Sequence, residues 1–480
     1  MKTDAAPGAT GIPRSDRRNP PALLRARAWW RDFGRAPRLM GIDVARALAV
    51  FGMMAAHFGA ASELELLRPE TWGALVHGRS SLLFAVLAGV SISLMTGRAR
   101  AAAESLPRIR LQLLGRGGVI FAIGLLLELL NTPIAVVLTL YGILYIVAVP
   151  CVRWSTTRIL IVAGAVALVA PVVLAGLYAV LLGPQGPGVT LVLFGTYPIT
   201  VWFALMLAGL VIGRMRLTEV RTAALLLLIG IALAAVGYGA GSAATAALGG
   251  MGDEGSWSSS WSSSSIASAS GNGGSAADLG VPSDDIDFSG MVCDDFRDGY
   301  ITCYPEDGVI PGSDNEGSWD DADPEGGWES YLEQVRGFEP LAGMLDAVVS
   351  VQPHSGGSAE IVGSGGFAIA VIGLCLLAAR PLRALLLPLA AVGSMPLTVY
   401  SLHVISYWVL VGPIGSMPAS GELWAWSAIA FVVLATVWSM LIGKGPLEQV
   451  AASAARRAAE PRPSGDSGPT PVMTGSRVDT

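Results

Sequence analysis

The sequence predicts an all-α fold, a polytopic transmembrane bundle of about ten helices with a largely disordered insert outside the cytoplasm. The first observation is the composition: 52% of the 480 residues are hydrophobic, only 14% are charged, and the mean hydropathy is +0.56. Such values are typical of polytopic membrane proteins and exclude an ordinary soluble enzyme. The other two observations are a series of apolar segments and the placement of the arginines between them.

Ten apolar segments are long enough to form membrane helices. They lie near residues 39–61, 79–96, 113–130, 134–150, 158–182, 197–213, 222–247, 360–378, 384–411 and 422–443. Pro171 predicts a kink within the fifth segment. The ninth is interrupted by Gly393, Ser394, Met395 and Pro396, which fits one kinked helix or a broken one.

The loops on alternate sides of the predicted membrane differ in their arginine content. One side carries Arg98, Arg100, Arg108, Arg110, Arg153, Arg158, Arg214, Arg216, Arg221, Arg380 and Arg383. The other side carries only Arg68, Arg79, Arg297 and Arg336. The positive-inside rule therefore predicts that both termini are cytoplasmic. The chain has 29 Arg and only two Lys, which suggests a GC-rich bacterial genome, so we expect a bacterial inner membrane.

This topology divides the chain into five parts. They are a basic cytoplasmic arm (1–38), helices one to seven (39–247), an acidic extracytoplasmic insert (248–356), helices eight to ten (357–443) and a disordered cytoplasmic tail (444–480). Within the arm, we expect residues 23–33 to form a short amphipathic helix on the membrane surface. Within the insert, we expect residues 329–338 to form a short helix leading back to the membrane.

The insert is strongly acidic and begins with a Ser/Gly-rich tract. Residues 252–340 contain 20 Asp and Glu against two Arg. A tract of this kind cannot bury enough apolar surface to become ordered. Cys293 and Cys303 are close in sequence and outside the cytoplasm, which predicts a disulfide across a hairpin turning at 297–299. The acidic residues near Asp321 match only the start of a calcium-binding loop, so we expect a solvated segment and no metal.

The first apolar segment carries three ionisable residues, Asp43, Arg46 and His57. Such groups are costly inside a membrane and indicate function or internal pairing. Asp43 and Arg46 are three residues apart and can pair within a helix. Arg46 and His57 lie on one helical face, roughly 16 Å apart along the axis.

An Arg, ten residues and then a His on a first membrane helix resembles the motif of acyltransferase-3-type membrane acyltransferases. The longer patterns RLMGIDVARALAVFGMMAAH from Arg38 and HGRSSLLFAVLAGVSISLMTGR from His77 resemble bacterial heparan-alpha-glucosaminide N-acetyltransferase-like proteins. So do PHSGGSAEIVGSGGFAIAVIGLCLL from Pro353, GSMPLTVYSLHV from Gly393 and GPLE from Gly445. The resemblance covers residues 37–247 and 351–449. It implies transfer of an acyl group, with acetyl a candidate, from cytoplasmic acyl-CoA to an extracytoplasmic sugar or glycolipid.

Site residues are assigned on this resemblance and on the chemistry of acyl transfer. His57 is the predicted catalytic residue, either as general base or as carrier of the acyl group. Asp43 and Arg46 are assigned to the donor, acetyl-CoA or another acyl-CoA. The predicted acceptor-binding residues share the outer half of the membrane: His77, Arg79, Ser80, Glu128, His354, Glu360 and His403.

Each of these residues also has a purely structural interpretation. Arg46 could only neutralise Asp43, for example, and His403 could be a polar packing residue within its helix. Two other functions therefore stay open: a transporter or exporter of an amphiphilic solute, and a non-catalytic membrane scaffold. The sequence contains no nucleic-acid patch, and besides the lipid bilayer a second copy of the chain is a possible partner.

Overall fold

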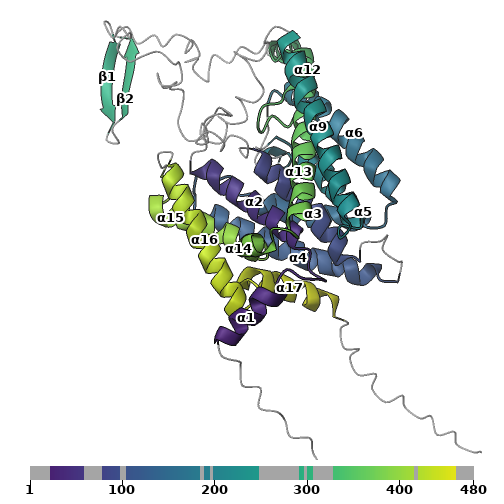
Figure 1. Ribbon diagram of the computed structural model, residues 1–480. Coiled ribbons are helices and arrows are strands. Elements are labelled where there is room, and N and C mark those ends of the chain that lie inside the picture. The colour runs from purple at the N-terminus through teal and green to yellow at the C-terminus, as the bar shows by residue number, and fades with distance from the viewer. Residues whose placement is uncertain are drawn as a thin grey trace, which may run out of the picture.

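A computed structural model describes residues 22–58, 78–97, 104–183, 189–194, 198–247, 291–296, 300–305, 328–415 and 420–460. Each of the ten predicted membrane segments contains helix, so the all-α transmembrane architecture is confirmed (Figure 1). The corresponding helices are α2 (Met40–His57), α3 (Arg79–Met95), α4 (Leu106–Glu128), α5 (Leu138–Cys151), α6 (Thr156–Val180), α8 (Ile199–Arg214), α9 (Val220–Ala247), α13 (Ser358–Ala378), α14 (Arg383–Gly393) with α15 (Pro396–Val411), and α16 (Gly421–Leu441).

The described helices differ in length relative to a bilayer. Six are long and apolar enough to cross it alone: α2, α4, α6, α9, α13 and α16. The bent pair α14 and α15 adds a seventh if the two helices are taken as one span. Helices α3, α5 and α8 are shorter apolar helices of 17, 14 and 16 residues. Helix α2 lies at the centre, because 78% of its residues are buried in the protein against 11% in α16.

The ninth segment is a broken helix. Its halves, α14 and α15, meet at 69° across Ser394 and Met395. Pro396 begins α15, and the hydroxyl of Ser394 donates to the carbonyl of Ala391 at 2.8 Å, which ends α14. Gly393 lies so close to α2 that a Cβ atom would overlap the carbonyl oxygen of Asp43. The break therefore lets α14 press against α2 while α15 follows another direction.

Four helices lie outside the ten predicted segments or at their ends. They are α1 (Ala22–Asp32), α11 (Trp328–Gly337), α12 (Pro340–Val349) and α17 (Pro446–Ala459), and a π-helical turn, η2, spans Thr190–Phe194. The predicted helices at 23–33 and 329–338 are confirmed by α1 and α11. Helices α1 and α17 lie at one end of the bundle and α12 at the opposite end (Figure 1).

The prediction of a wholly disordered tail from residue 444 is wrong for α17. This helix packs so closely on α4 that a Cβ atom at Gly115 would meet the carbonyl oxygen of Ala454. Its Ala451 is fully buried. The carboxylate of Glu448 also accepts hydrogen bonds from α15. These contacts order the first half of the tail, while 461–480 lies outside the described residues.

The described part of the insert includes a small β-hairpin. Strands β1 (Met291–Phe296) and β2 (Tyr300–Pro305) pair antiparallel, with Cys293 opposite Cys303. This register places the two cysteines as a cross-linked hairpin requires, and the disulfide stays a prediction. The predicted turn at 297–299 and the predicted disordered stretches, 248–290 and 306–327, lie outside the described residues.

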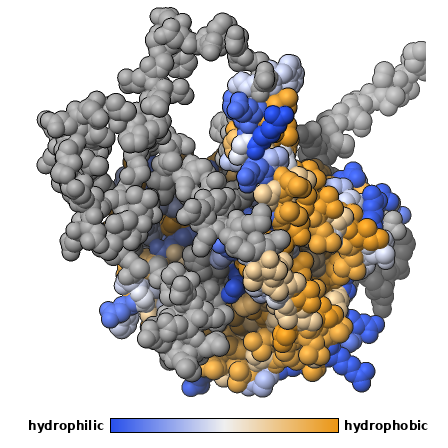
Figure 2. Space-filling view, turned by 90° about the horizontal axis from the view of Figure 1, so that it is seen from above, coloured by the Kyte–Doolittle hydropathy of each residue, from blue (hydrophilic) through white to orange (hydrophobic). Residues whose placement is uncertain are grey.

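Apolar side chains form a broad surface on the face of the bundle seen in Figure 2. Large apolar side chains are exposed along α4, α6, α9 and α16, as lipid contact requires. Inside it, glycines permit helices to touch through their backbones. Gly89 of α3 faces the carbonyl of Met206 in α8, and Gly209 of α8 faces the carbonyl of Val86 in α3, each too close for a Cβ atom.

We expect Gly209→Ala to lower the thermal stability of the purified protein in detergent. The added methyl would force α3 and α8 apart, and overpacking of this kind costs about 1–3 kcal/mol or more. Gly239→Ala is the matched control, because a Cβ at this exposed glycine of α9 meets nothing within 4 Å. Equal melting temperatures for the two variants would contradict the close packing of α3 against α8.

The orientation can be tested with a reporter enzyme that is active only outside the cytoplasm. Fused at Gly255 it should be active, and fused at Gly97 or Ser464 it should be silent, because the arginine bias places these last two sites inside. A reversed pattern would place His57 and the predicted acceptor-binding residues on the cytoplasmic side of the membrane.

Candidate functional site

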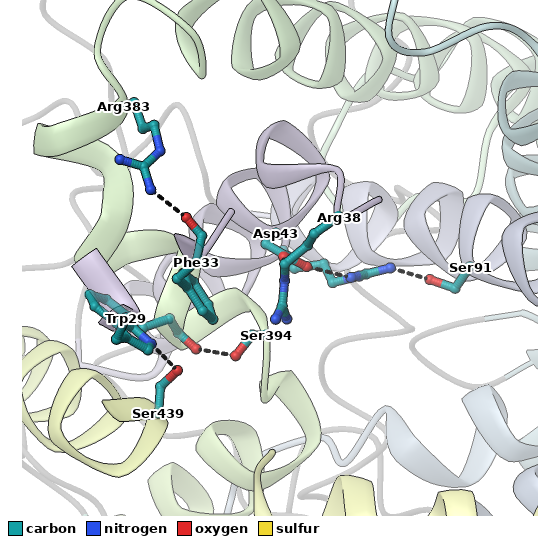
Figure 3. Close-up of polar contacts among 10 residues, drawn as sticks. Trp29, Phe33, Arg38, Asp43, Ser91, Arg383, Ser394 and Ser439 are labelled. Carbon is teal, nitrogen blue, oxygen red and sulfur yellow. Dashed lines mark hydrogen bonds and ion pairs between the residues drawn. The ribbon is translucent and has the colours of Figure 1, made fainter. Parts of the chain in front are cut away.

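A chain of buried polar contacts fixes the first half of α2. Asp43 is only 4% exposed, and its carboxylate accepts from two arginines, Arg46 Nη1 at 2.8 Å and Arg38 Nε at 2.6 Å. Arg46 Nη2 in turn donates to the hydroxyl of Ser91 in α3 at 2.8 Å (Figure 3). The predicted Asp43–Arg46 pair is thus confirmed, and Arg38 is a second partner that the sequence analysis placed in the basic arm.

Arg46 lines a cavity of about 300 Å³, here called the inner cavity. Its walls come from α2, α3, α4, α5, the start of α15 and α17. A second arginine lines it: the Nε of Arg116 is buried, with no hydrogen-bond partner among the described residues. Tyr141, Tyr145 and Ser91 add hydroxyl groups. The inner cavity therefore presents two cations and several donors, a lining suited to phosphate or amide oxygens.

Glu448 closes one side of the inner cavity. Its carboxylate accepts from the backbone N–H groups of Leu397 and Thr398 at 2.7 and 3.1 Å and from the Thr398 hydroxyl at 2.5 Å. These N–H groups have no partner within α15, because they lie in its first turn. Helix α17 thus caps α15 and fixes the wall beside Arg116.

The opposite end of α2 carries a histidine pair. His57 Nδ1 lies 3.0 Å from His403 Nε2, and the two ring planes differ by only 2°. His403 is 1% exposed, and its Nδ1 has no hydrogen-bond partner among the described residues. The break between α14 and α15 gives α15 the direction that brings His403 to the last residue of α2.

A second, smaller cavity lies beside this pair and is here called the outer cavity. Its volume is about 20 Å³, enough for about one water molecule. His57, Ser80, Ser81, His354 and Tyr400 line it. Three predicted site residues, His57, Ser80 and His354, thus line one cavity, and His403 contacts His57.

Glu360 reaches the site indirectly, through the loop that carries His354. Its side chain is buried and accepts from the N–H groups of His354 and Gly356 at 2.9 and 2.7 Å and from the Ser355 hydroxyl at 3.1 Å. His354 adopts φ +69°, a left-handed conformation that needs such support. The carboxylate therefore positions the histidine and does not line the outer cavity.

Two other predicted acceptor residues point elsewhere. Arg79 donates to the Tyr238 hydroxyl at 2.9 Å and stacks on the same ring, so it joins α3 to α9. Glu128 is exposed and accepts from the Thr139 hydroxyl at 2.9 Å, between α4 and α5. His77 lies outside the described residues.

The two cavities approach each other within about one helical turn. On α3, Ser81 lines the outer cavity and Phe84 the inner one, and on α15 the same holds for Tyr400 and Leu397. At the start of α5, two consecutive residues line different cavities: Val137 lines the outer cavity and Leu138 lines the inner cavity. One layer of apolar side chains thus separates a cavity lined by Arg46, Arg116 and Glu448 from a histidine site.

Comparison with known proteins finds a match in the part of the chain that contains α2. Residues 38–240 match the family model of the catalytic domain of heparan-alpha-glucosaminide N-acetyltransferase. The match contains Asp43, Arg46 and His57 and ends before His354 and His403. No curated protein and no solved structure matches the chain. Residues 38–240 of this multi-pass membrane protein are therefore similar to the catalytic domain of heparan-alpha-glucosaminide N-acetyltransferase, which indicates a membrane acetyltransferase.

Proposed function

We propose that the protein transfers an acetyl group from acetyl-CoA in the inner cavity to an amine or hydroxyl group of a sugar or glycolipid at the outer cavity. The observation that carries this proposal is the placement of Arg46 and His57 on one buried helix, in two cavities about one helical turn apart. The arginine bias supports entry of the donor from the cytoplasm and of the acceptor from the other side.

Arg46 and Arg116 would hold the donor. Their guanidinium groups suit the phosphate oxygens or the amide carbonyls of coenzyme A, and Arg116 has an unused buried Nε–H. The donor supplies the acyl group as a thioester. The apolar layer at Phe84 and Leu138 would face the acyl end and exclude water from it.

His57 would act as the general base. When its Nδ1–H donates to His403 Nε2, His57 Nε2 carries a lone pair that can accept the proton of the attacking amine or hydroxyl. The acceptor then forms a bond to the acyl carbon, the carbon–sulfur bond breaks, and the proton passes to the departing sulfur. His403 is a positioning residue in this scheme because it selects the reactive tautomer of His57.

His57→Ala should reduce acetyl transfer by about a hundred- to ten-thousand-fold while donor binding stays near the wild-type value. The proton acceptor is lost, whereas the inner cavity is intact. Transfer is measured with labelled acetyl-CoA and binding by calorimetry, both on purified protein in nanodiscs. His403→Gln should keep more activity than His403→Ala, because a Gln carbonyl can still accept from His57.

Full turnover by His57→Ala, or no binding of coenzyme A by the wild type, would contradict the proposal and favour the transporter. Mass spectrometry after incubation with acetyl-CoA alone tests the base role separately. An acetylated His57 would show that this residue carries the acyl group itself.

Arg116→Gln should weaken coenzyme A binding by roughly ten- to a hundredfold, the effect of losing one charge-assisted contact. Arg110→Gln is the matched control, since Arg110 lies on the same helix but is exposed. Equal affinities for the two variants would remove Arg116 from the donor site.

Arg46→Ala needs a control of its own, because it leaves the buried Asp43 with a single partner. The double change Asp43→Asn with Arg46→Gln removes both charges of the pair. It should restore folding, measured as melting temperature, without restoring donor binding.

A further inference from the structure

A third cavity, of about 600 Å³, lies at the arginine-rich end of the bundle and is here called the basic cavity. Its walls are the 34–41 segment between α1 and α2, the 217–223 segment at the start of α9, and the 376–383 segment between α13 and α14. Three membrane-spanning helices thus begin or end at this cavity, which sets its depth at the boundary between the hydrocarbon and the headgroups. Exposed apolar side chains continue along the adjoining helices, with Val220 56% exposed and Leu385 71% exposed.

The charge in the basic cavity is one-sided. Four arginines line it, Arg35, Arg38, Arg380 and Arg383. The one acidic side chain in its lining, Glu219, is already paired with Arg216 at 3.2 Å. Of the four arginines, Arg38 alone has an ion pair among the described residues, with Asp43.

Backbone carbonyls hold two of these guanidinium groups in place without neutralising them. Arg383 Nη2 donates to the carbonyls of Trp30, Arg31 and Phe33 at 2.9, 3.0 and 2.8 Å. Figure 3 shows the last of these three hydrogen bonds. Arg380 Nη2 donates to the carbonyl of Thr218. Arg383 Nε is buried and has no hydrogen-bond partner among the described residues.

Helix α1, which precedes the 34–41 wall of the cavity, is itself docked on the bundle. Its Trp29 donates through Nε1 to the Ser439 hydroxyl of α16 at 2.8 Å (Figure 3). Arg383 binds carbonyls at the C-terminal end of α1. The arginines of the 34–41 segment are thereby held opposite those that follow α13. A cluster of cations fixed in this way attracts an anion with several acceptor oxygens, as a phosphate has.

We propose that the basic cavity binds the phosphate headgroup of an anionic phospholipid from the adjoining leaflet, with its acyl chains along the exposed apolar faces of α9 and α14. Coenzyme A also carries phosphates, but its proposed site is the inner cavity around Arg46. The two cavities are distinct, because Arg46 binds Asp43 Oδ1 from the inner cavity and Arg38 binds Asp43 Oδ2 from the basic cavity. The lipid site stands independently of acyl transfer, because it rests on the described arginines and on the depth of the cavity.

The test uses the full-length protein in phosphatidylcholine nanodiscs, prepared with or without phosphatidylglycerol. Native mass spectrometry of the protein released from these nanodiscs identifies the lipids that stay bound. The wild type should retain phosphatidylglycerol in preference to phosphatidylcholine. Arg35→Gln with Arg380→Gln should reduce that retention by roughly tenfold or more. Arg108→Gln with Arg110→Gln is the matched control, because it removes two exposed arginines of α4 at the same end and should leave retention unchanged.

Equal loss of lipid in both double variants would show a diffuse charge effect and overturn the proposal. So would retention of phosphatidylglycerol by the Arg35/Arg380 variant. Coenzyme A is added in a further arm: if it displaces the lipid, and the variant loses coenzyme A binding, the cavity takes the phosphates of the donor instead. Arg35→Gln alone, at an exposed side chain, serves if the double variant does not fold.

Discussion

The buried carboxylate of Asp43 is the contact on which the arrangement of this protein depends. An isolated charge of this kind inside a membrane protein costs at least a few kcal/mol, so it requires both of its arginines. Arg38 holds it from the basic cavity and Arg46 from the inner cavity, while Ser91 ties Arg46 to α3. This network fixes the rotation of α2, and the rotation in turn decides where His57 points.

Two other carboxylates stabilise the structure by accepting hydrogen bonds from backbone N–H groups next to helix ends. Glu360 satisfies the N–H groups of the loop before α13, and Glu448 satisfies those of the first turn of α15. Lipid offers no hydrogen bonds to such groups, so they need partners within the protein. Each carboxylate stabilises the backbone next to one cavity, Glu360 beside His354 and Glu448 beside Arg116. Glu360, which the sequence analysis assigned to acceptor binding, is thus a support for the neighbouring backbone.

Local patterns predicted much of the fold. Apolar length located the ten helical segments, and the spacing of Asp43 and Arg46 predicted their ion pair, since both signals depend on neighbours in sequence. Helix α17 was missed because its order comes from packing on α4 and from Glu448, which are contacts over long sequence distances. The contact of His57 with His403 likewise required the direction of α15 after a break that the sequence left open. Arg116 could have been found, because the rule that singled out Arg46 applies equally to an arginine within the third apolar segment.

The proposed function requires the donor to lie in the inner cavity, with its reactive end directed toward His57. A structure of the protein in nanodiscs with coenzyme A, determined by electron cryomicroscopy, tests this most directly. We expect density between Arg46 and Arg116, with the thiol at the apolar layer formed by Phe84 and Leu138. Coenzyme A bound elsewhere, or with its thiol pointing away from His57, would contradict acetyl transfer at His57.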